Sequence, residues 1–288
     1  MSELANGPRR VGVVGGGTMG TGIAYVFAAA GCEVTLVEPS SAQAAVAHRA
    51  ILDRAAGAAE RGKLPREAAE RVAELLRTVP DVAGLDTGLD LVVESVPERL
   101  DLKRSVLALA EQRKPTLLAS NTSGLPIRDV GSGLRDPDAV LGLHFFNPVW
   151  SMPLVEIVHT EATPSAQIDR ARAAAALIGK ETILVRDAPG FATSRLGVAL
   201  GLEAIRMLED GVAEAADIDK AMELGYRHPM GPLRLTDLVG LDVRLDIARN
   251  LAAAYGERFA PPKLLVDKVA AGEIGRKSGR GFYYWDDR

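Results

Sequence analysis

Short apolar runs alternate with helical segments along the first two thirds of the chain, which predicts a mostly parallel sheet flanked by helices. The expected strands are 10–14, 33–37, 90–95, 116–120, 140–146, 153–158 and 182–185. Helices are expected over 21–30, 100–113 and 164–178. After Pro189 the strands stop, and helical patterns cover 191–210, 215–224, 233–255 and 262–271. We therefore predict an α/β N-terminal domain, 1–188, and a smaller all-α C-terminal domain, 189–288.

A glycine-rich turn follows the first expected strand. Residues Gly15–Gly20 read G-x-G-x-x-G and run directly into a helix. Gly15 permits the tight bend, Gly17 lets the backbone approach a pyrophosphate, and Gly20 allows close packing of helix and strand. Glu38 ends the second strand, where a carboxylate accepts hydrogen bonds from the adenosine ribose and repels a 2′-phosphate. These features predict a Rossmann-type domain and an NAD site with the following residues: Gly15, Gly17, Thr18, Met19, Gly20 and Glu38.

Residues 40–79 are rich in Ala, Glu and Arg at helical spacing, with an interruption at Gly62–Pro65. This pattern predicts a helical arm, made of one helix to about residue 60 and another over 65–77. Three basic side chains on the arm either meet an anionic ligand or form a solvated charged face: Arg54, Arg61 and Lys63.

Two apolar segments, 140–146 and 153–158, are joined by a polar bend, and each carries one ionisable residue, His144 or Glu156. If the bend lets the segments run antiparallel, the two side chains lie side by side. A histidine paired with a carboxylate is a general base whose ring is oriented by its partner. The alternative is a structural histidine, partly buried, whose hydrogen-bonding capacity is satisfied by the neighbouring carboxylate. Polar residues of 120–124 also follow a strand, where they either bind a ligand or cap a turn.

Composition narrows the classes of protein and partner. The 288 residues are 47% hydrophobic and 25% charged, with a net charge of −4, which gives no support for a nucleic-acid partner. The single cysteine, Cys32, excludes an internal disulfide, and no apolar run approaches membrane-spanning length. We expect a cytoplasmic protein with no membrane or metal partner. The long apolar faces of the C-terminal helices predict a homodimer through that domain.

Eight segments of the chain resemble the short-chain L-3-hydroxyacyl-CoA dehydrogenases, and are most similar to bacterial 3-hydroxybutyryl-CoA dehydrogenases. The segments are GGGTMG (15–20), VVESVPERLDLK (92–103), SNTSGLPI (120–127), GLHFFNPV (142–149), MPLVEIV (152–158), DAPGF (187–191), PMGPL (229–233) and GRKSGRGFYYW (275–285). The resemblance covers nearly the whole chain.

The resemblance implies NAD-dependent oxidation of an L-3-hydroxyacyl-CoA, such as 3-hydroxybutyryl-CoA, to the 3-ketoacyl-CoA. It implies that His144 is the catalytic base and Glu156 its partner, with Ser123 and Asn147 catalytic and in contact with substrate. It adds four cofactor positions to those above: Glu98, Lys103, Ser123 and Lys277. Ser194 stands where the family commonly has asparagine, and its hydroxyl has a shorter reach as a substrate-binding group.

Two other hypotheses are compatible with the sequence. The same chemistry could act on a hydroxyacyl group carried by an acyl-carrier protein, or on a free hydroxy acid. A non-catalytic NAD-binding protein is the third reading, and loss of His144 or Glu156 would have favoured it. The remaining histidines, His48, His159 and His228, are interpreted as structural or solvent-facing.

Overall fold

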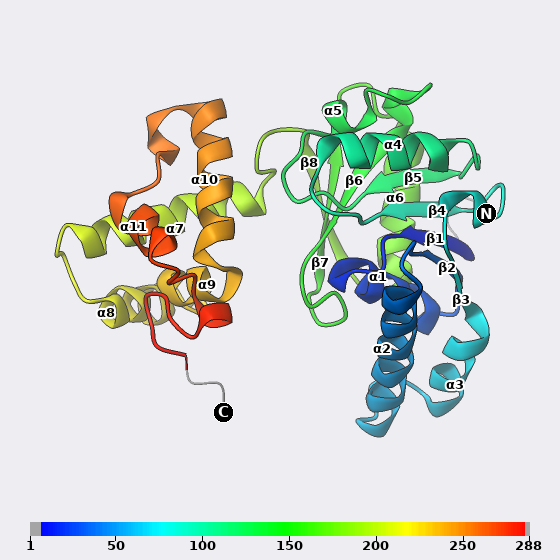
Figure 1. Cartoon of the computed structure of the whole chain (residues 1–288), viewed down its shortest axis with the longest axis horizontal. Coiled ribbons are helices and arrows are strands. Elements are labelled where there is room, and N and C mark those ends of the chain that lie inside the picture. Colours follow the sequence, from blue (N-terminus) through cyan, green and yellow to red (C-terminus); the bar gives the residue numbers. More distant parts are fainter. Residues whose placement is uncertain (1–6, 286–288) are drawn as a thin grey trace. The chain divides into compact units, whose positions relative to one another are not determined.

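The computed structural model describes residues 7–285 and divides the chain into two compact units, Met1–Ala188 and Pro189–Arg288 (Figure 1). We call them unit 1 and unit 2. Each has a buried apolar core of its own, formed around the sheet in unit 1 and among the helices in unit 2.

The described residues of unit 1 form an eight-stranded sheet in the order β3-β2-β1-β4-β5-β6-β7-β8. Neighbouring strands are parallel except β6 and β7, which are antiparallel. The order reverses between β1 and β4, and ligands bind such sheets at the carboxyl ends of the strands beside that point. The predicted Rossmann-type α/β class is confirmed. The strands are β1 (Arg10–Val14), β2 (Glu33–Val37), β3 (Leu76–Val79), β4 (Leu91–Glu94), β5 (Leu117–Ser120), β6 (Val140–Phe145), β7 (Leu154–His159) and β8 (Glu181–Arg186).

Helices cover the sheet, so central strands such as β4 and β6 are buried at every residue. No helix in residues 7–285 combines the length and the apolar character needed to cross a membrane. The helices of unit 1 are α1 (Thr18–Ala29), α2 (Ser41–Glu60), α3 (Arg66–Leu75), α4 (Leu100–Glu111), α5 (Ile127–Gly131) and α6 (Ser165–Leu177), with short 3₁₀ turns η2 (Val82–Gly84) and η3 (Pro137–Ala139).

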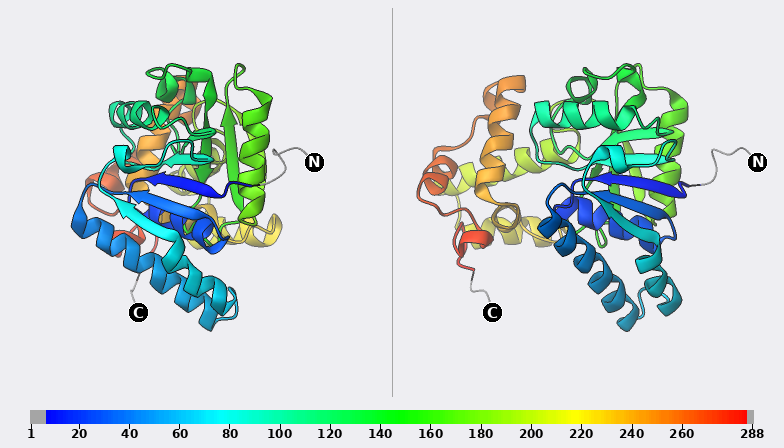
Figure 2. Two further views of the ribbon diagram at one scale, coloured as in Figure 1. Left: turned by 90° about the vertical axis from the view of Figure 1, so that its right-hand side faces the viewer. Right: turned by 45° about the vertical axis from the view of Figure 1, so that its right-hand side comes forward.

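The expected helical arm is present but shorter than predicted. Helices α2 and α3 pack against each other and extend from the sheet (Figure 2). Residues Leu76–Val79 form β3, a parallel edge strand beside β2, whereas the second helix was predicted to continue to Arg77. Leu76 turns inward and is buried, while Arg77 and Thr78 are exposed. The β-branched Thr78 and Val79 favour an extended backbone, and the open edge of β2 supplies the hydrogen-bond partners that end the helix.

Unit 2 is helical, as predicted, and the only β pairing among its described residues is a pair of isolated bridges that link Gly275, Arg280 and Tyr284. Its core includes Val198, Leu202, Leu241 and Leu265. The helices are α7 (Thr193–Glu209), α8 (Ala215–Lys220), a π-helical turn η4 (Ala221–Gly225), α9 (Pro232–Val239), α10 (Leu241–Tyr255), η5 (Glu257–Phe259), α11 (Lys263–Ala270) and η6 (Arg276–Ser278).

The single helix predicted over residues 233–255 is wrong, because the chain breaks at Gly240 into α9 and α10. Gly240 has a φ of +103°, a conformation that other residues rarely adopt. The C-terminal segment packs against this break, where the Leu241 N–H donates to the Ile274 carbonyl and Lys277 bonds Asp242. The periodic apolar pattern continues across the glycine, so it gave no indication of a turn there.

The C-terminal segment is held by one buried carboxylate. Asp237 on α9 accepts hydrogen bonds from the backbone N–H groups of Phe282 and Tyr283 and from the indole Nε1 of Trp285, at 2.8, 2.9 and 2.7 Å. These bonds explain why the aromatic run near the C-terminus lies on unit 2.

Candidate active site

The glycine-rich turn joins β1 to α1 at the carboxyl edge of the sheet. Gly15 has a φ of +110°, and a Cβ there would lie 2.6 Å from the backbone oxygen of Ser95. A Cβ on Gly20 would collide with the backbone oxygen of Gly15, whereas one on Gly17 would meet no described atom within 4 Å. Gly15 and Gly20 are therefore needed for the turn itself, and Gly17 leaves space for a ligand to approach the backbone.

Helix α1 begins at Thr18, three residues earlier than predicted, so Thr18 and Met19 belong to its first turn. Gly17 at its N-cap position supplies no side-chain cap. The first N–H groups of the helix are thus available to an anionic ligand such as a pyrophosphate.

Glu38 lies directly across this turn. Its Oε2 accepts a hydrogen bond from the Gly16 N–H at 2.9 Å, and its Oε1 accepts one from the Ser40 N–H at 3.0 Å. The Gln43 side-chain amide donates to the Gly16 carbonyl at 2.7 Å. The carboxylate predicted to contact the ribose is therefore fixed beside the glycine-rich turn.

His144 and Glu156 face each other across the antiparallel pair β6–β7. Their Cα atoms are register partners, and Nδ1 of His144 lies 2.6 Å from Oε2 of Glu156. Both side chains are buried, and the histidine ring lies 4.4 Å from the ring of Phe146. As predicted, the bend brings the two ionisable groups together.

One cavity of about 1010 Å³ in unit 1 gathers most of the predicted site. It extends from the glycine-rich turn past the ends of β4 and β5 to the bend after β6. The predicted site residues that line it are Gly15, Gly17, Thr18, Met19, Glu38, Glu98, Ser123, His144 and Asn147. The glycine-rich turn and His144 therefore line one cavity, and Glu156 lies buried behind His144.

Two family models match consecutive parts of the chain. The model described as "3-hydroxyacyl-CoA dehydrogenase, NAD binding domain" matches residues 10–188, and the one described as "3-hydroxyacyl-CoA dehydrogenase, C-terminal domain" matches residues 190–285. The chain belongs to the 3-hydroxyacyl-CoA dehydrogenase family. It is an NAD-dependent oxidoreductase.

Relatives of this dehydrogenase match it over nearly its full length. A 3-hydroxybutyryl-CoA dehydrogenase of Mycobacterium tuberculosis is 42% identical over 285 residues, which cover 97% of this chain and 99% of the relative. The solved structure of (S)-3-hydroxybutyryl-CoA dehydrogenase from Ralstonia eutropha has a TM-score of 0.92 and 32% identity, with 97% and 100% of the chains covered. A 3-hydroxyadipyl-CoA dehydrogenase of Escherichia coli is 39% identical over 96% of this chain and 58% of its own.

Lys103 of the dehydrogenase lies beneath the cavity instead of lining it. Its Nζ is 2.9 and 3.2 Å from the two carboxylate oxygens of Glu94, 3.1 Å from the Val96 carbonyl and 3.2 Å from Oε2 of Glu98. Glu94 also accepts hydrogen bonds from the Val96 N–H and the Ser120 hydroxyl, both at 2.6 Å. Lys103 therefore joins the ends of β4 and β5 from below, and its ammonium is engaged by oxygens of the protein itself.

Glu98 carries this network to the cavity. Its Oε1 accepts hydrogen bonds from the Thr122 hydroxyl at 2.6 Å and from the Ser123 N–H and hydroxyl at 2.9 and 3.3 Å. Burial alone would raise the pKa of Glu98, but the charge of Lys103 and the hydrogen bonds from Thr122 and Ser123 outweigh it and lower that pKa. An ionised Glu98 thus fixes the backbone and the hydroxyl of Ser123.

The residue list predicted from the sequence omitted Glu94 and Asn121. The Asn121 Oδ1 accepts a hydrogen bond from the Phe145 N–H at 2.9 Å, so it connects the end of β5 to β6 beside His144. A carboxylate at the end of the apolar run Leu91–Glu94, with a lysine nine residues later, was the available sequence signal for Glu94.

Two predicted site residues belong to unit 2. Ser194 lies in the first turn of α7, and Lys277 lies in η6, where its Nζ is 2.6 Å from Oδ2 of Asp242. The structure of unit 1 thus assembles the cofactor turn, Ser123, Asn147 and the histidine–carboxylate pair without either of them.

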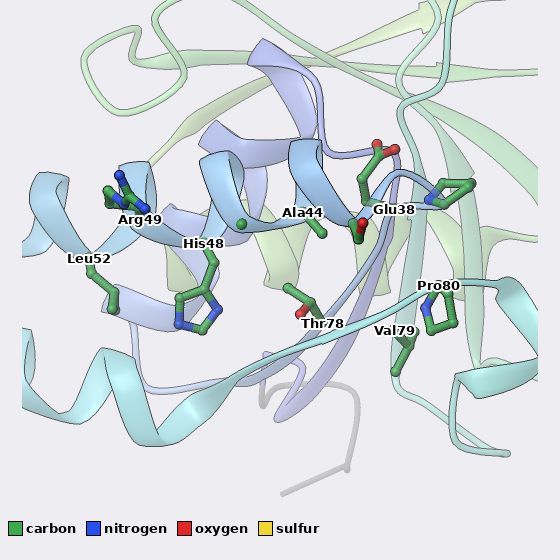
Figure 3. Close-up of a pocket in the computed structure, with 11 residues that line it drawn as sticks. Glu38, Ala44, His48, Arg49, Leu52, Thr78, Val79 and Pro80 are labelled. Atoms are coloured by element: carbon green, nitrogen blue, oxygen red, sulfur yellow. The ribbon is translucent and has the colours of Figure 1, made fainter.

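A second cavity, of about 610 Å³, lies between α2 and β3 (Figure 3). His48 projects from α2 towards the strand that carries Thr78, and Glu38 lies at the opposite end (Figure 3). This cavity shares Glu38, Pro39 and Pro80 with the larger one, so Glu38 contributes to both.

Proposed function

We propose that the protein oxidises L-3-hydroxyacyl-CoA to 3-ketoacyl-CoA with NAD, and that His144 is the general base in this direction and the general acid in reverse. The observation that carries the proposal is the 2.6 Å contact of His144 with Glu156 in the cavity that also contains the glycine-rich turn.

His144 is the residue that transfers the proton. In the neutral imidazole, the Nδ1–H group donates a hydrogen bond to Glu156. The other ring nitrogen, Nε2, then holds the lone pair that removes the hydroxyl proton of the substrate. The imidazolium that forms is stabilised by the Glu156 carboxylate. Bound NAD supplies the hydride acceptor. In the reverse direction His144 returns the proton to the developing alkoxide.

Ser123 and Asn147 act with this pair in our proposal. Both line the cavity, and Glu98 holds Ser123 through its backbone N–H and its hydroxyl. The Ser123 hydroxyl is a hydrogen-bond donor for the oxygen on which charge develops, and Asn147 supports the substrate from the bend after β6. Ser194 is proposed as a substrate contact of α7, with a hydroxyl in place of the family's asparagine.

For NAD, we propose that the turn Gly15–Gly20 with α1 takes the pyrophosphate and that Glu38 takes the adenosine ribose. Glu98 and Ser123 contact the cofactor at the ends of β4 and β5, with Lys277 as a further contact from unit 2. Lys103 contributes through Glu98, because its ammonium is already surrounded by Glu94, Val96 and Glu98.

The short acyl group of 3-hydroxybutyryl-CoA is our reference substrate, because relatives at 42% and 32% identity carry that name. We test it by NAD reduction with L-3-hydroxybutyryl-CoA, free 3-hydroxybutyrate and longer 3-hydroxyacyl-CoA esters. Rapid turnover of CoA esters alone is the expected result. If the protein binds NAD but turns over no CoA ester, the proposal is overturned. Carrier-protein thioesters and free hydroxy acids would then be tested as substrates.

We also propose a homodimer through unit 2. Large apolar side chains are exposed on it, among them Leu196, Leu224 and Val243. Light scattering of the purified chain tests this proposal, and we expect a molar mass of twice 30.5 kDa.

We also propose that the protein works in a reducing compartment such as the cytoplasm, because its single cysteine, Cys32, is a buried free thiol. Burial raises the pKa of Cys32 to about 11, and the charge of Asp90 adds to this shift.

A further inference from the structure

The bend that carries Asn147 is held by three other elements of unit 1. It spans residues 146–153, between the end of β6 and the start of β7, and Asn147 lines the large cavity from it. The backbone N–H groups of Ser151 and Met152 both donate to the Pro148 carbonyl at 3.0 Å, which closes a turn within the bend. The contacts that this turn makes with other elements therefore decide where Asn147 lies.

Two of these elements are helix α1 and the segment that joins α6 to β8. Val149 is buried, and a Cβ on Gly22 of α1 would lie 2.8 Å from its Cγ2, so the glycine allows the bend to approach the helix closely. Lys180, which follows α6, donates from Nζ to the Met152 carbonyl at 2.7 Å. The bend is thereby held at its middle against the helix of the glycine-rich turn and at its end against the start of β8.

The third element is the helical arm. Arg54 on α2 places its guanidinium carbon over the ring of Trp150, 3.7 Å from the ring centroid. A guanidinium at this distance is attracted by the π-face of an indole. Trp150 is 38% exposed and Arg54 is half-buried, so the contact is partly shielded from water. Arg54, one of the three basic side chains of the arm, thus has an aromatic partner within the chain.

Helix α1 contributes to the surroundings of this contact. Tyr25 of α1 is buried, which raises the pKa of its phenol, and the positive charges of Arg54 and Arg61 oppose that shift. The guanidinium is therefore close enough to act on Tyr25 as well as on Trp150, and α1 packs along α2. The contact belongs to a packed junction of α1, α2 and the bend.

We propose that Arg54 and Trp150 are positioning residues for the reaction, which fix Asn147 for the substrate by holding the bend against the helical arm. This inference rests on the proposed function, in which Asn147 supports the substrate, and it gives the arm a role in that function. The bend continues directly from the strand of His144, whose ring lies 4.4 Å from that of Phe146. A displacement of the bend by about 1 Å is enough to lower the rate strongly, because the reaction depends on the alignment of bound groups.

The cofactor side of the cavity is held by other bonds. Glu38 bonds the glycine-rich turn through the Gly16 N–H, and Glu98 bonds Ser123. Loss of the contact between Arg54 and Trp150 should therefore change kcat and the KM of the hydroxyacyl substrate and leave the affinity for NADH as it is. A general loss of structure in unit 1 would weaken both, so the two measurements distinguish positioning from stability.

The test compares single and double variants of the pair with 3-hydroxybutyryl-CoA. Arg54→Met and Trp150→Ala should each lower kcat/KM by about tenfold or more, with the affinity for NADH unchanged. The double variant should lose no more than either single variant, because both substitutions remove the same contact. Arg54→Lys and Trp150→Phe keep a cation and an aromatic ring, so each should retain most of the rate. Arg71→Met is the control, with an exposed side chain on α3 of the same arm, and it should leave the rate unchanged.

A second substrate separates positioning from direct binding of the carrier. The N-acetylcysteamine thioester of 3-hydroxybutyrate has the same acyl group and thioester but lacks the phosphates of CoA. If Arg54 positions the bend, Arg54→Met lowers kcat/KM by the same factor for both thioesters. A loss confined to the CoA ester would mean that Arg54 binds a phosphate of the carrier, and it would overturn the inference.

The remaining outcomes separate the inference from the proposed function. No turnover of 3-hydroxybutyryl-CoA by the wild type overturns the proposed function, and the inference with it. Wild-type turnover with an unchanged kcat/KM in Arg54→Met, or additive losses in the double variant, overturns the inference alone. A loss of NADH affinity as large as the loss of rate does the same. If Trp150→Ala does not fold, Arg54→Met with the two thioesters decides.

Discussion

The Nζ of Lys103 lies 2.9 Å from Oε1 of Glu94, and both side chains are sealed from solvent. This pair joins α4 to the end of β4, and Glu94 extends the connection to Ser120 at the end of β5. The opposite side of the ammonium contacts Glu98, which holds Ser123. A charge network beneath the cavity thus sets the positions of groups that line it.

Replacing Lys103 by Met should destabilise unit 1 by about 3–5 kcal/mol, because it leaves the Glu94 carboxylate buried without its cation. Urea unfolding of the full chain measures this loss, with the exposed Lys63→Met as the control. We also expect a higher KM for NAD, since Glu98 loses the group that keeps it ionised. A stability equal to that of the control variant would contradict a structural role for Lys103.

The lowered pKa of Glu98 predicts a specific dependence of stability on pH. A carboxylate with a lowered pKa in the folded state contributes stability above its ordinary pKa of about 4.3, and this contribution is lost as the pH falls through the lowered value. Glu98→Gln should therefore cost stability at pH 7, and its difference from the wild type should shrink towards pH 3. Chemical unfolding at both pH values measures it; a difference that stays constant with pH argues against the ionised Glu98.

Replacing His144 by Gln should reduce kcat by about 10²–10⁴-fold, the usual contribution of a positioned general base, while NAD still binds. His159→Gln is the matched control, because His159 ends the neighbouring strand β7 and bonds the Thr160 carbonyl through Nδ1. Steady-state rates measure catalysis, and titration with NADH, followed by the fluorescence of its reduced nicotinamide, measures cofactor binding. Equal rates in the two variants would remove His144 from the proposed mechanism.

Replacing Glu38 by Ala should reduce the preference for NAD over NADP. The carboxylate lies at the glycine-rich turn, where it would repel a 2′-phosphate, and its removal also takes away an acceptor for the ribose. The ratio of kcat/KM for the two cofactors measures the change, and we expect it to move towards NADP by about tenfold or more. Unchanged discrimination would mean that other groups select the cofactor.

Local patterns of the sequence determined most of the fold and part of the site. The period of apolar residues predicted the strands and helices around the glycine-rich turn, because a buried face repeats every second or every third to fourth residue. The turn itself was predicted because Gly15 and Gly20 are required by geometry within a few residues. His144 and Glu156 stood out as ionisable groups in apolar strands, and the bend between them is short enough for the strands to pair.

Tertiary structure decided what depends on partners distant in sequence. Leu76–Val79 became a strand because the edge of β2 offered backbone hydrogen bonds, and the turn at Gly240 is packed against the C-terminal segment. The contacts of Lys103 with Glu94 and the Val96 carbonyl were likewise not predicted from the sequence. The burial of Arg244 is equally invisible in the sequence. Burial and pairing of charges depend on which elements pack together, and a local pattern does not contain that information.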